Sequence, residues 1–182
     1  MLALENTPLK DCFLLKPSVF EDERGTFYES YNQQRFEETT GLKINFVQDN
    51  QSTSQKGVLR GFHFQTGAHA QAKLVRAVAG EVLDVVVDLR PDSPTFKKSY
   101  KVVLSNENKL ELFVPAGFAH GFLTISEASV FAYKCDQYYN KQSEAGIIWN
   151  DPTLNIDWEF SEKDIILSEK DALLPNFEEL DL

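Results

Sequence analysis

The feature that most constrains the fold of this chain is a series of short strand-like segments separated by turn residues. Such segments follow one another over residues 44–50, 58–64, 73–78, 81–89, 101–104, 110–114, 120–125 and 129–134, and Gly, Pro, Asn or Ser interrupts them. Within residues 81–89 the side chains alternate, so one strand face would carry Leu83, Val85, Val87 and Leu89 and the other Asp84, Val86 and Asp88. This spacing predicts an all-β sandwich or jelly-roll barrel, because a parallel α/β sheet would need helices between its strands.

The two ends of the chain add less regular elements. Residues 12–15 and 25–31 read as strands, Asn32 as a helix N-cap, and residues 33–40 as a short helix that ends at Gly41. After Pro152 we expect a mixed tail, irregular or weakly helical over residues 161–174, that packs across the barrel. No repeat or linker divides the 182 residues, so we expect a single domain over residues 1–182.

Charge and cysteine content limit the possible partners and location. The net charge of −10 repels nucleic acid and anionic membranes, but a local basic cluster can still bind a small anion. No apolar run approaches the length needed to span a membrane, and the first residues lack the basic start and apolar segment of a signal peptide. We therefore expect a cytoplasmic protein in which Cys12 and Cys135 are reduced.

Four ionisable residues lie in segments that otherwise read as β-strands. Arg60 and His63 lie in the run 58–64, with Gly61 and Phe62 between them. Lys73 begins another run, and His120 is framed by Ala119 and Gly121 in a third. Ionisable groups among apolar strand residues indicate a cavity more often than a solvated face. Together they indicate proton-transfer chemistry, in which an imidazole takes a proton near pH 7 and a lysine stabilises an enolate.

Each of these residues also has a purely structural interpretation. A lone histidine such as His63 is usually a core residue with one hydrogen bond, and Lys73 alone fits equally well a lysine that reaches solvent from a strand end. Tyr133 and Tyr139 would ordinarily serve packing, although a phenol can donate a proton and its ring can stack on a base. The scattered basic residues, taken singly, would be surface charges, but if they converged they would bind a doubly negative group such as a pyrophosphate.

The sequence gives little evidence for a metal site. Barrels of this kind often bind a metal through a His-x-His pair, but His63 is followed by Phe64 and Gln65. His69 lies in a segment that reads as a loop, and the chain has no closely spaced cysteine pair. We therefore predict that the protein binds no metal.

A set of ordered motifs extends over most of the chain. They are the segments 57–65, 71–76, 80–90, 93–96, 115–122, 133–134, 149–152 and 167–171, beginning with Gly57-Val-Leu-Arg-Gly-Phe-His-Phe-Gln and including Pro115-Ala-Gly-Phe-Ala-His-Gly-Phe. In order and spacing, from Phe20 to Pro175, the chain resembles the dTDP-4-dehydrorhamnose 3,5-epimerase family.

The resemblance implies a cupin-type jelly roll without metal or cofactor. It implies a homodimer in which N-terminal strands pair with the partner subunit. It also implies an isomerase that converts dTDP-4-dehydro-6-deoxy-D-glucose to dTDP-4-dehydro-L-rhamnose, in the synthesis of dTDP-rhamnose for cell-envelope polysaccharides.

The resemblance also implies roles for individual residues. His63 would be the base, Asp171 its orienting carboxylate, and Tyr133 the acid on the opposite face of the sugar. Lys73 and His120 would lie near polar groups of the sugar. Further contacts to the ligand would come from Arg24, Glu29, Gln48, Asp49, Asn50, Arg60, Glu144 and Lys170, with Tyr139 and Phe20 stacked on the thymine.

Three alternatives remain open from the sequence. A sister enzyme that epimerises only carbon 3 or carbon 5, or that isomerises the keto group, would share His63 and Tyr133. A non-catalytic sugar-binding cupin is less compatible with the presence of His63, Lys73 and Tyr133 together. A metal-dependent cupin oxygenase is disfavoured by the missing His-x-His pair.

Overall fold

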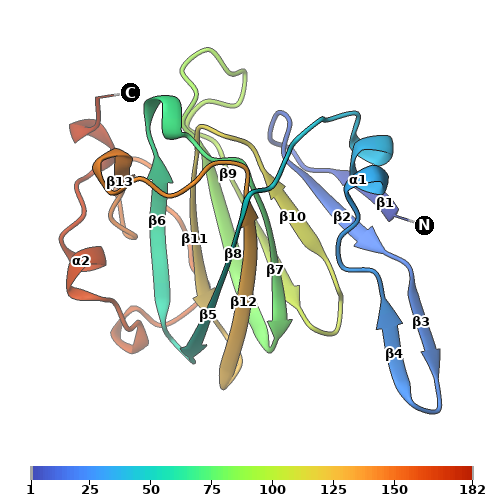
Figure 1. Ribbon diagram of the computed structural model, residues 1–182. Coiled ribbons are helices and arrows are strands. Elements are labelled where there is room, and N and C mark those ends of the chain that lie inside the picture. Colours follow the sequence, from blue (N-terminus) through green and yellow to red (C-terminus); the bar gives the residue numbers. More distant parts are fainter. Residues whose placement is uncertain (1, 182) are drawn as a thin grey trace.

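The computed structural model describes residues 2–181, and its two main sheets are entirely antiparallel (Figure 1). The six-stranded sheet contains, in spatial order, β1 (Leu2–Asn6), β2 (Phe13–Pro17), β10 (Glu111–Val114), β7 (Lys73–Ala79), β12 (Ala128–Cys135) and β5 (Gln48–Gln55). The five-stranded sheet contains β13 (Glu144–Gly146), β6 (Leu59–Gln65), β11 (Phe118–Thr124), β8 (Glu81–Asp88) and β9 (Ser99–Ser105). A separate hairpin consists of β3 (Val19–Asp22) and β4 (Gly25–Tyr28).

The main core lies between the two sheets. It is built from inward-facing residues such as Val75 and Phe131 of the six-stranded sheet and Val86 and Phe122 of the five-stranded sheet. The predicted all-β fold is confirmed and the arrangement fits a cupin-type jelly roll, although the two sheets do not close into a continuous barrel.

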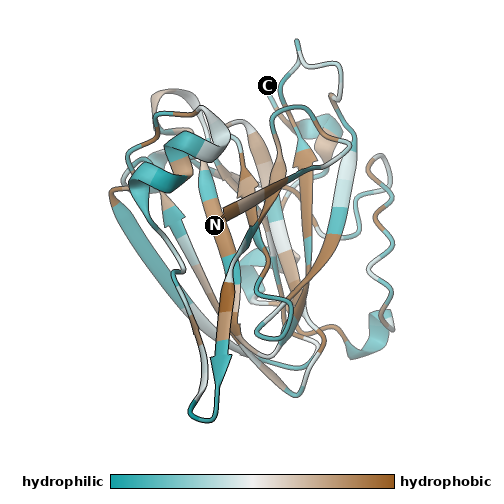
Figure 2. Cartoon of the chain, turned by 90° about the vertical axis from the view of Figure 1, so that its right-hand side faces the viewer, coloured by the Kyte–Doolittle hydropathy of each residue, from teal (hydrophilic) through white to brown (hydrophobic). Residues whose placement is uncertain are grey.

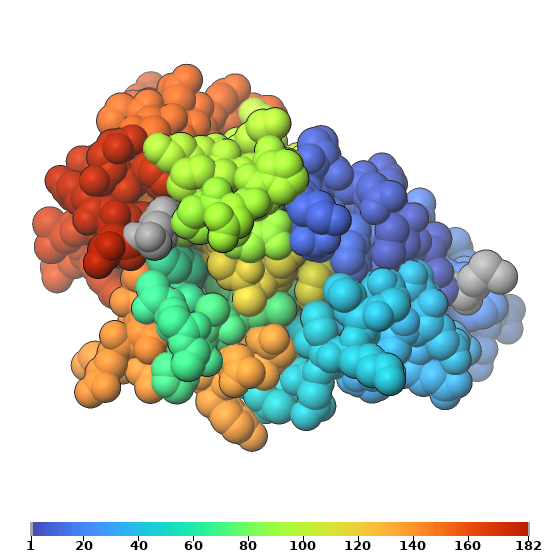
Figure 3. Space-filling model, turned by 90° about the horizontal axis from the view of Figure 1, so that it is seen from above, coloured from blue at the N-terminus to red at the C-terminus, as the bar shows by residue number. Residues whose placement is uncertain are grey.

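The C-terminal extension covers the outer face of the five-stranded sheet. Trp158 and Phe177 pack there against Phe62 and against the face of β8 that carries Leu83 and Val85. Short 3-10 turns at Glu162–Asp164 and Phe177–Glu179 and the helix α2 (Glu169–Ala172) shape this extension. Figure 3 shows it on the opposite side of the molecule from the N-terminal strands. The tail therefore packs across the sheet as predicted.

The helix α1 (Gln33–Thr40) lies against the outer face of the six-stranded sheet. The Asn32 side chain accepts a hydrogen bond from the backbone N–H of Arg35, and Gly41 adopts a left-handed conformation with φ of 74°, so both predicted ends of the helix are confirmed. Phe36 is its buried residue and packs on Phe113 of β10. The rest of the helix is hydrophilic and faces outward (Figure 2).

The strands differ from the prediction mainly at sheet edges. The strand expected over residues 44–50 is instead Gln48–Gln55, because Ile44 and Phe46 pack in the cluster beneath α1 while a polar edge strand follows them. The strand expected over residues 25–31 ends at Tyr28. Strands β1, β3 and β13 were not predicted.

The single domain expected over residues 1–182 stays a prediction, and its two end residues lie outside the described part. In residues 2–181, the helices are too short or too polar to cross a membrane.

Candidate active site

A cavity of about 420 Å³ opens between the two sheets next to the C-terminal extension. Its walls come from β5, β6, β7, β11 and β12 and from the segment that contains α2. The ionisable and phenolic side chains that line it are Arg60, His63, Lys73, His120, Tyr133, Lys170 and Asp171. Seven of the fifteen residues predicted for the site therefore meet in one cavity, although they come from widely separated segments.

His63 forms a close pair with Asp171. The Nε2 atom of His63 lies 2.8 Å from Oδ1 of Asp171, and the His63 side chain is about one-third exposed while that of Asp171 is buried. Ser168 caps α2 by accepting a hydrogen bond from the backbone N–H of Asp171, which fixes the position of this carboxylate. Burial acts to raise the pKa of Asp171. Hydrogen bonds from the His63 side chain, the Ser168 side chain and the Gly61 backbone nevertheless hold this pKa below the ordinary value of 3.8. Asp171 is therefore a carboxylate across the pH range in which His63 would act.

Lys73 and Tyr133 lie on the neighbouring strands β7 and β12. The Lys73 ammonium is 5.9 Å from the centre of the Tyr133 ring. Burial lowers the pKa of Lys73 below its ordinary 10.5, although the nearby Cys135, Asp84 and Glu144 act to raise it. Burial also raises the pKa of Tyr133 above 10, so its phenol stays protonated at neutral pH.

His120 stands on β11 directly opposite His63 on β6. Its Nε2 atom lies 2.8 Å from Oδ2 of Asp84 on β8, and both side chains are buried. The cavity thus contains two histidines, each of which is paired with a carboxylate.

A polar network extends from Lys170, which lines the cavity, to residues that are not part of its lining. Lys170 forms an ion pair of 2.6 Å with Glu144, and the Tyr139 hydroxyl donates to the other oxygen of Glu144 at 2.9 Å. Burial would raise the pKa of Glu144, but these two hydrogen bonds keep it below 4.5. The Gln48 side chain accepts from the backbone N–H of Tyr139 and donates to Asn50. This network links the predicted residues Gln48, Asn50, Tyr139, Glu144 and Lys170, although Asn50 itself lines a different cavity of about 510 Å³.

Arg60 and Asp49 have contacts of their own. The Arg60 guanidinium donates to the Ser54 hydroxyl at 3.0 Å and to the carbonyl of Thr53, so it is held against β5. Asp49 forms an ion pair of 2.8 Å with Lys134 and lines a different cavity of about 510 Å³. The structure therefore does not bring Asp49 into the cavity between the sheets.

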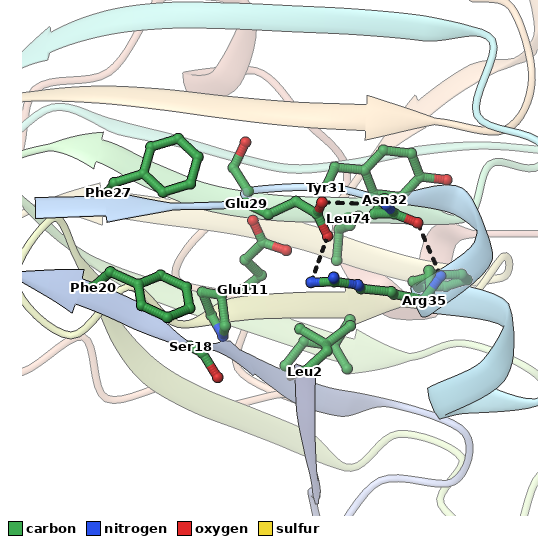
Figure 4. Close-up of a pocket in the computed structure, with 14 residues that line it drawn as sticks. Leu2, Ser18, Phe20, Phe27, Glu29, Tyr31, Asn32, Arg35, Leu74 and Glu111 are labelled. Atoms are coloured by element: carbon green, nitrogen blue, oxygen red, sulfur yellow. Dashed lines mark hydrogen bonds and ion pairs between the residues drawn. The ribbon is translucent and has the colours of Figure 1, made fainter.

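Phe20, Arg24 and Glu29 also lie away from this cavity. Phe20 belongs to β3 and Arg24 to the turn of the hairpin, which projects from the body of the molecule (Figure 1). Phe20 and Phe27 face each other across the hairpin and, with Glu29, line a separate cavity of about 320 Å³ (Figure 4). Arg24 pairs locally with Asp22. Within one chain these three residues cannot act together with His63.

Two residues that shape the site were not predicted from the sequence. Asp84 pairs with His120, and Ser168 caps the helix that carries Asp171. The signal for Asp84 was its place on the inward face of an alternating strand. The signal for Ser168 was its position three residues before Asp171, a spacing typical of an N-cap.

Comparisons with known proteins agree with this geometry. The model of the family dTDP-4-dehydrorhamnose 3,5-epimerase matches residues 6–179. The enzyme of that name from Salmonella typhimurium is 54% identical over 175 residues, which cover 96% of this chain and 95% of the relative. The crystal structure of dTDP-4-dehydrorhamnose 3,5-epimerase from Elizabethkingia anophelis has 59% identity and a TM-score of 0.93, with 97% of each chain covered.

A second solved structure adds a ligand-bound relative. The dTDP-6-deoxy-D-glucose-3,5-epimerase from Legionella pneumophila, in complex with dTDP-4-keto-L-rhamnose, has 47% identity and a TM-score of 0.95. The match covers 100% of this chain and 95% of the Legionella chain. The predicted resemblance and enzyme class are confirmed, and the chain belongs to the dTDP-4-dehydrorhamnose 3,5-epimerase family of isomerases.

Proposed function

We propose that the protein converts dTDP-4-dehydro-6-deoxy-D-glucose to dTDP-4-dehydro-L-rhamnose by inverting the two carbons that flank the keto group. The observation that carries this proposal is the convergence of His63, Lys73 and Tyr133 on one cavity between the sheets. The similarity to an epimerase solved with dTDP-4-keto-L-rhamnose supports the choice of sugar nucleotide.

His63 removes the proton from the carbon beside the ketone in this proposal. Its Nε2 faces Asp171, so Nδ1 is the nitrogen left to act as base. As the C–H bond breaks, its electrons move onto the keto oxygen and form an enolate. The Asp171 carboxylate orients the imidazole and stabilises the imidazolium that results.

Lys73 stabilises the enolate oxygen. Its ammonium is buried in the cavity, and a positive charge is worth more in such surroundings than in water because little solvent screens it.

Tyr133 returns a proton to the opposite face of the ring carbon. Inversion requires a donor on the wall that faces the base, and Tyr133 comes from the six-stranded sheet whereas His63 comes from the five-stranded sheet. The phenol loses its proton to the carbon and regains one from solvent, while the His63 imidazolium releases to solvent the proton that it took. The same pair of groups would act on both carbons in turn.

The mouth of the cavity would hold the nucleotide. Arg60 and Lys170 supply positive charge for the diphosphate, and the exposed ring of Tyr139 provides a surface for the thymine. Gln48, Asn50 and Glu144 would contribute polar contacts.

The protein would act as a homodimer. Phe20, Arg24 and Glu29 are remote from the cavity of their own chain, and Phe20 and Phe27 are 65% and 71% exposed on a projecting hairpin. Exposed aromatic pairs of this kind favour an intermolecular contact. Through this hairpin the three residues would reach the site of the partner subunit. Asp49 lines a cavity on the outside of the six-stranded sheet, where it too would meet the partner.

The activity is tested by epimerisation in heavy water. Purified protein is incubated with the 4-keto sugar nucleotide and a downstream reductase, and deuterium in the product is counted by mass spectrometry and located by NMR. The proposal predicts deuterium at both carbons that flank the keto group. Incorporation at one carbon only would instead identify a mono-epimerase, and no incorporation would rule out the proposed reaction.

The dimer is tested by mixing two inactive variants. Arg24→Ala has a defective hairpin and His63→Asn a defective cavity. If the hairpin serves the partner's site, the mixed dimer contains one site with both defects and one intact site, so mixing restores activity. The two variants carry different affinity tags, so that the mixed dimer can be isolated through both. An isolated mixed dimer without activity would contradict the shared site.

The remaining predictions from the sequence are part of this proposal. The protein would need no cofactor or metal and would be cytoplasmic, where it would supply dTDP-rhamnose for cell-envelope polysaccharides.

A further inference from the structure

Asp84 is a fully buried carboxylate with an incomplete set of partners. One of its oxygens, Oδ2, lies 2.8 Å from Nε2 of His120. The other, Oδ1, is one of two buried side-chain polar atoms in residues 2–181 that have no hydrogen-bond partner. Burying a carboxylate without satisfying both oxygens is unfavourable, so its retention needs a reason other than stability.

The other acidic residue on the same strand face shows what a structural carboxylate looks like. Asp88 is also fully buried, but it accepts hydrogen bonds from Arg90, Ser93 and Thr95 and so ties neighbouring loops together. Asp84 has no such network: its one hydrogen-bond partner among the described residues is His120, and its charge also acts on the nearby Lys73. The residues beside it on this face, Val82 and Val86, are apolar core residues. Asp84 therefore occupies a position that an apolar residue could fill.

The partner of Asp84 is a wall of the candidate active site. His120 lines the cavity, and its ring lies nearly parallel to that of Phe131, with 5.9 Å between centres and 26° between planes. Because Nε2 faces Asp84, Nδ1 is the nitrogen that remains, and no described protein group bonds to it. A carboxylate beside one ring nitrogen favours the tautomer with its proton on that nitrogen, which leaves the other as an acceptor.

We propose that Asp84 is a positioning residue that holds His120 in the Nε2–H tautomer, so that Nδ1 accepts a hydrogen bond from a hydroxyl group of the sugar. The role rests on the proposed function, since the sugar is the proposed occupant of the cavity. It assigns the two histidines different tasks: His63 uses its free nitrogen to take a proton from carbon, whereas His120 uses its own to hold a hydroxyl.

The tautomer is tested directly in the unmodified protein. The chain has three histidines, so a ¹⁵N–¹H spectrum of histidine-labelled protein contains three imidazoles. The His120→Gln variant identifies the signals of His120. At neutral pH we expect His120 to carry its proton on Nε2. An Nδ1–H tautomer or a doubly protonated ring would overturn the proposal, whether or not the protein proves to be an epimerase.

The positioning role is tested with two substitutions of Asp84. Asp84→Leu removes the acceptor and should give a mixed tautomer with a 10–100-fold lower kcat/KM for the 4-keto sugar nucleotide, roughly the loss typical when a carboxylate that orients a histidine is removed. Asp84→Asn keeps a neutral acceptor and should give an intermediate loss. Affinity for dTDP, which has no sugar at this position, should not change. An equal loss of dTDP affinity would overturn the proposal in favour of a structural role.

Two controls separate the outcomes. Val86→Ala removes packing next to His120 without touching the pair, and it should leave the tautomer unchanged. In a His120→Gln background, Asp84→Leu should add little further loss, because the two residues act as a unit. If the losses of the two single variants simply add in the double variant, the proposal is overturned.

If Asp84→Leu does not fold, the Asp84→Asn variant and the spectrum of the unmodified protein still decide between the positioning role and a structural one. If the unmodified protein does not turn over the sugar, the proposed function fails while the tautomer is still measured.

Discussion

His63 and His120 are directly opposite neighbours on the antiparallel strands β6 and β11, and each faces a carboxylate through Nε2 at 2.8 Å. The carboxylates come from different directions, since Asp171 belongs to the C-terminal extension and Asp84 to the adjacent strand β8. The free nitrogen of each ring is thereby left for the cavity. This relationship underlies the predictions that follow.

Replacing His63 by Asn should remove the base and abolish exchange of the sugar's ring hydrogens with heavy water. We expect kcat to fall about 10²–10⁴-fold, the usual contribution of a positioned general base. His69→Asn is the matched control, because His69 lies outside the cavity and contacts Asn140. Substantial hydrogen exchange in the His63 variant, measured by NMR, would show that another group is the base.

Replacing Tyr133 by Phe should impair the return of the proton more than its removal. The base is intact in this variant, so substrate recovered from heavy water should contain deuterium even though little product forms. The measurement compares deuterium in recovered substrate with product yield over time. If deuterium uptake into the substrate and formation of product fell by the same factor, Tyr133 would not be the specific proton donor on the ring face opposite His63.

We expect kcat to fall at high pH because Lys73 loses its proton, which gives the alkaline limb of the pH profile. Its pKa is lowered by burial, so the enolate-stabilising charge is lost as the pH rises, below the 10.5 of an ordinary lysine. Tyr133 does not produce this limb first, because its pKa is raised above 10. We expect Lys73→Met to be nearly inactive. Lys73→Arg, to the extent that it is active, should lose the limb since a guanidinium stays charged. A limb unchanged in the Arg variant would contradict the assignment.

Replacing Gly61 by Ala should disturb the two histidines together. Gly61 has φ of 131°, and a Cβ placed on it would lie 2.5 Å from the Cα of Gly121, which follows His120. Backbone in this region costs a non-glycine residue about 1–3 kcal/mol, and the clash adds to that. Chemical denaturation should show lower stability, and the Gly41→Ala variant, whose added Cβ meets nothing, provides a control for left-handed strain alone. Equal stability of the two variants would show that the close strand contact is unimportant.

Replacing Glu111 by Gln should stabilise the protein increasingly as the pH rises. Burial raises the pKa of Glu111 to about 8 from 4.5, although Arg76 and Lys134 act to lower it. The folded state therefore holds this proton more tightly than the unfolded state. The resulting stability is fully present below pH 4.5 and is lost as the pH rises through the folded pKa.

Chemical denaturation at several pH values checks this expectation. The gain from Glu111→Gln should grow between pH 4.5 and about 8 and then level off. The exposed Glu38→Gln provides a control with no such trend. A gain that is independent of pH would mean that Glu111 is ionised in the folded protein.

The sequence alone predicted the fold well where strands are central and poorly where they lie at edges. The alternation in residues 81–89 is enforced by the two-residue period of a strand, and it correctly separated Leu83 and Val85 from Asp84. Strand β5 was misplaced because its residues are polar, and an edge strand is stabilised by backbone pairing with β12 rather than by apolar alternation.

The sequence by itself determined the family, the all-β class and the ionisable residues that stand on strands, because these follow from residue type and spacing. Only the tertiary structure decided which of those residues meet. It joined His63 to Asp171 across 108 positions, gave His120 the partner Asp84, and kept Phe20 and Arg24 away from the cavity of their own chain. Strand periodicity fixes the face on which a side chain lies, but its neighbours depend on register and on how the sheets pack, which local sequence does not specify.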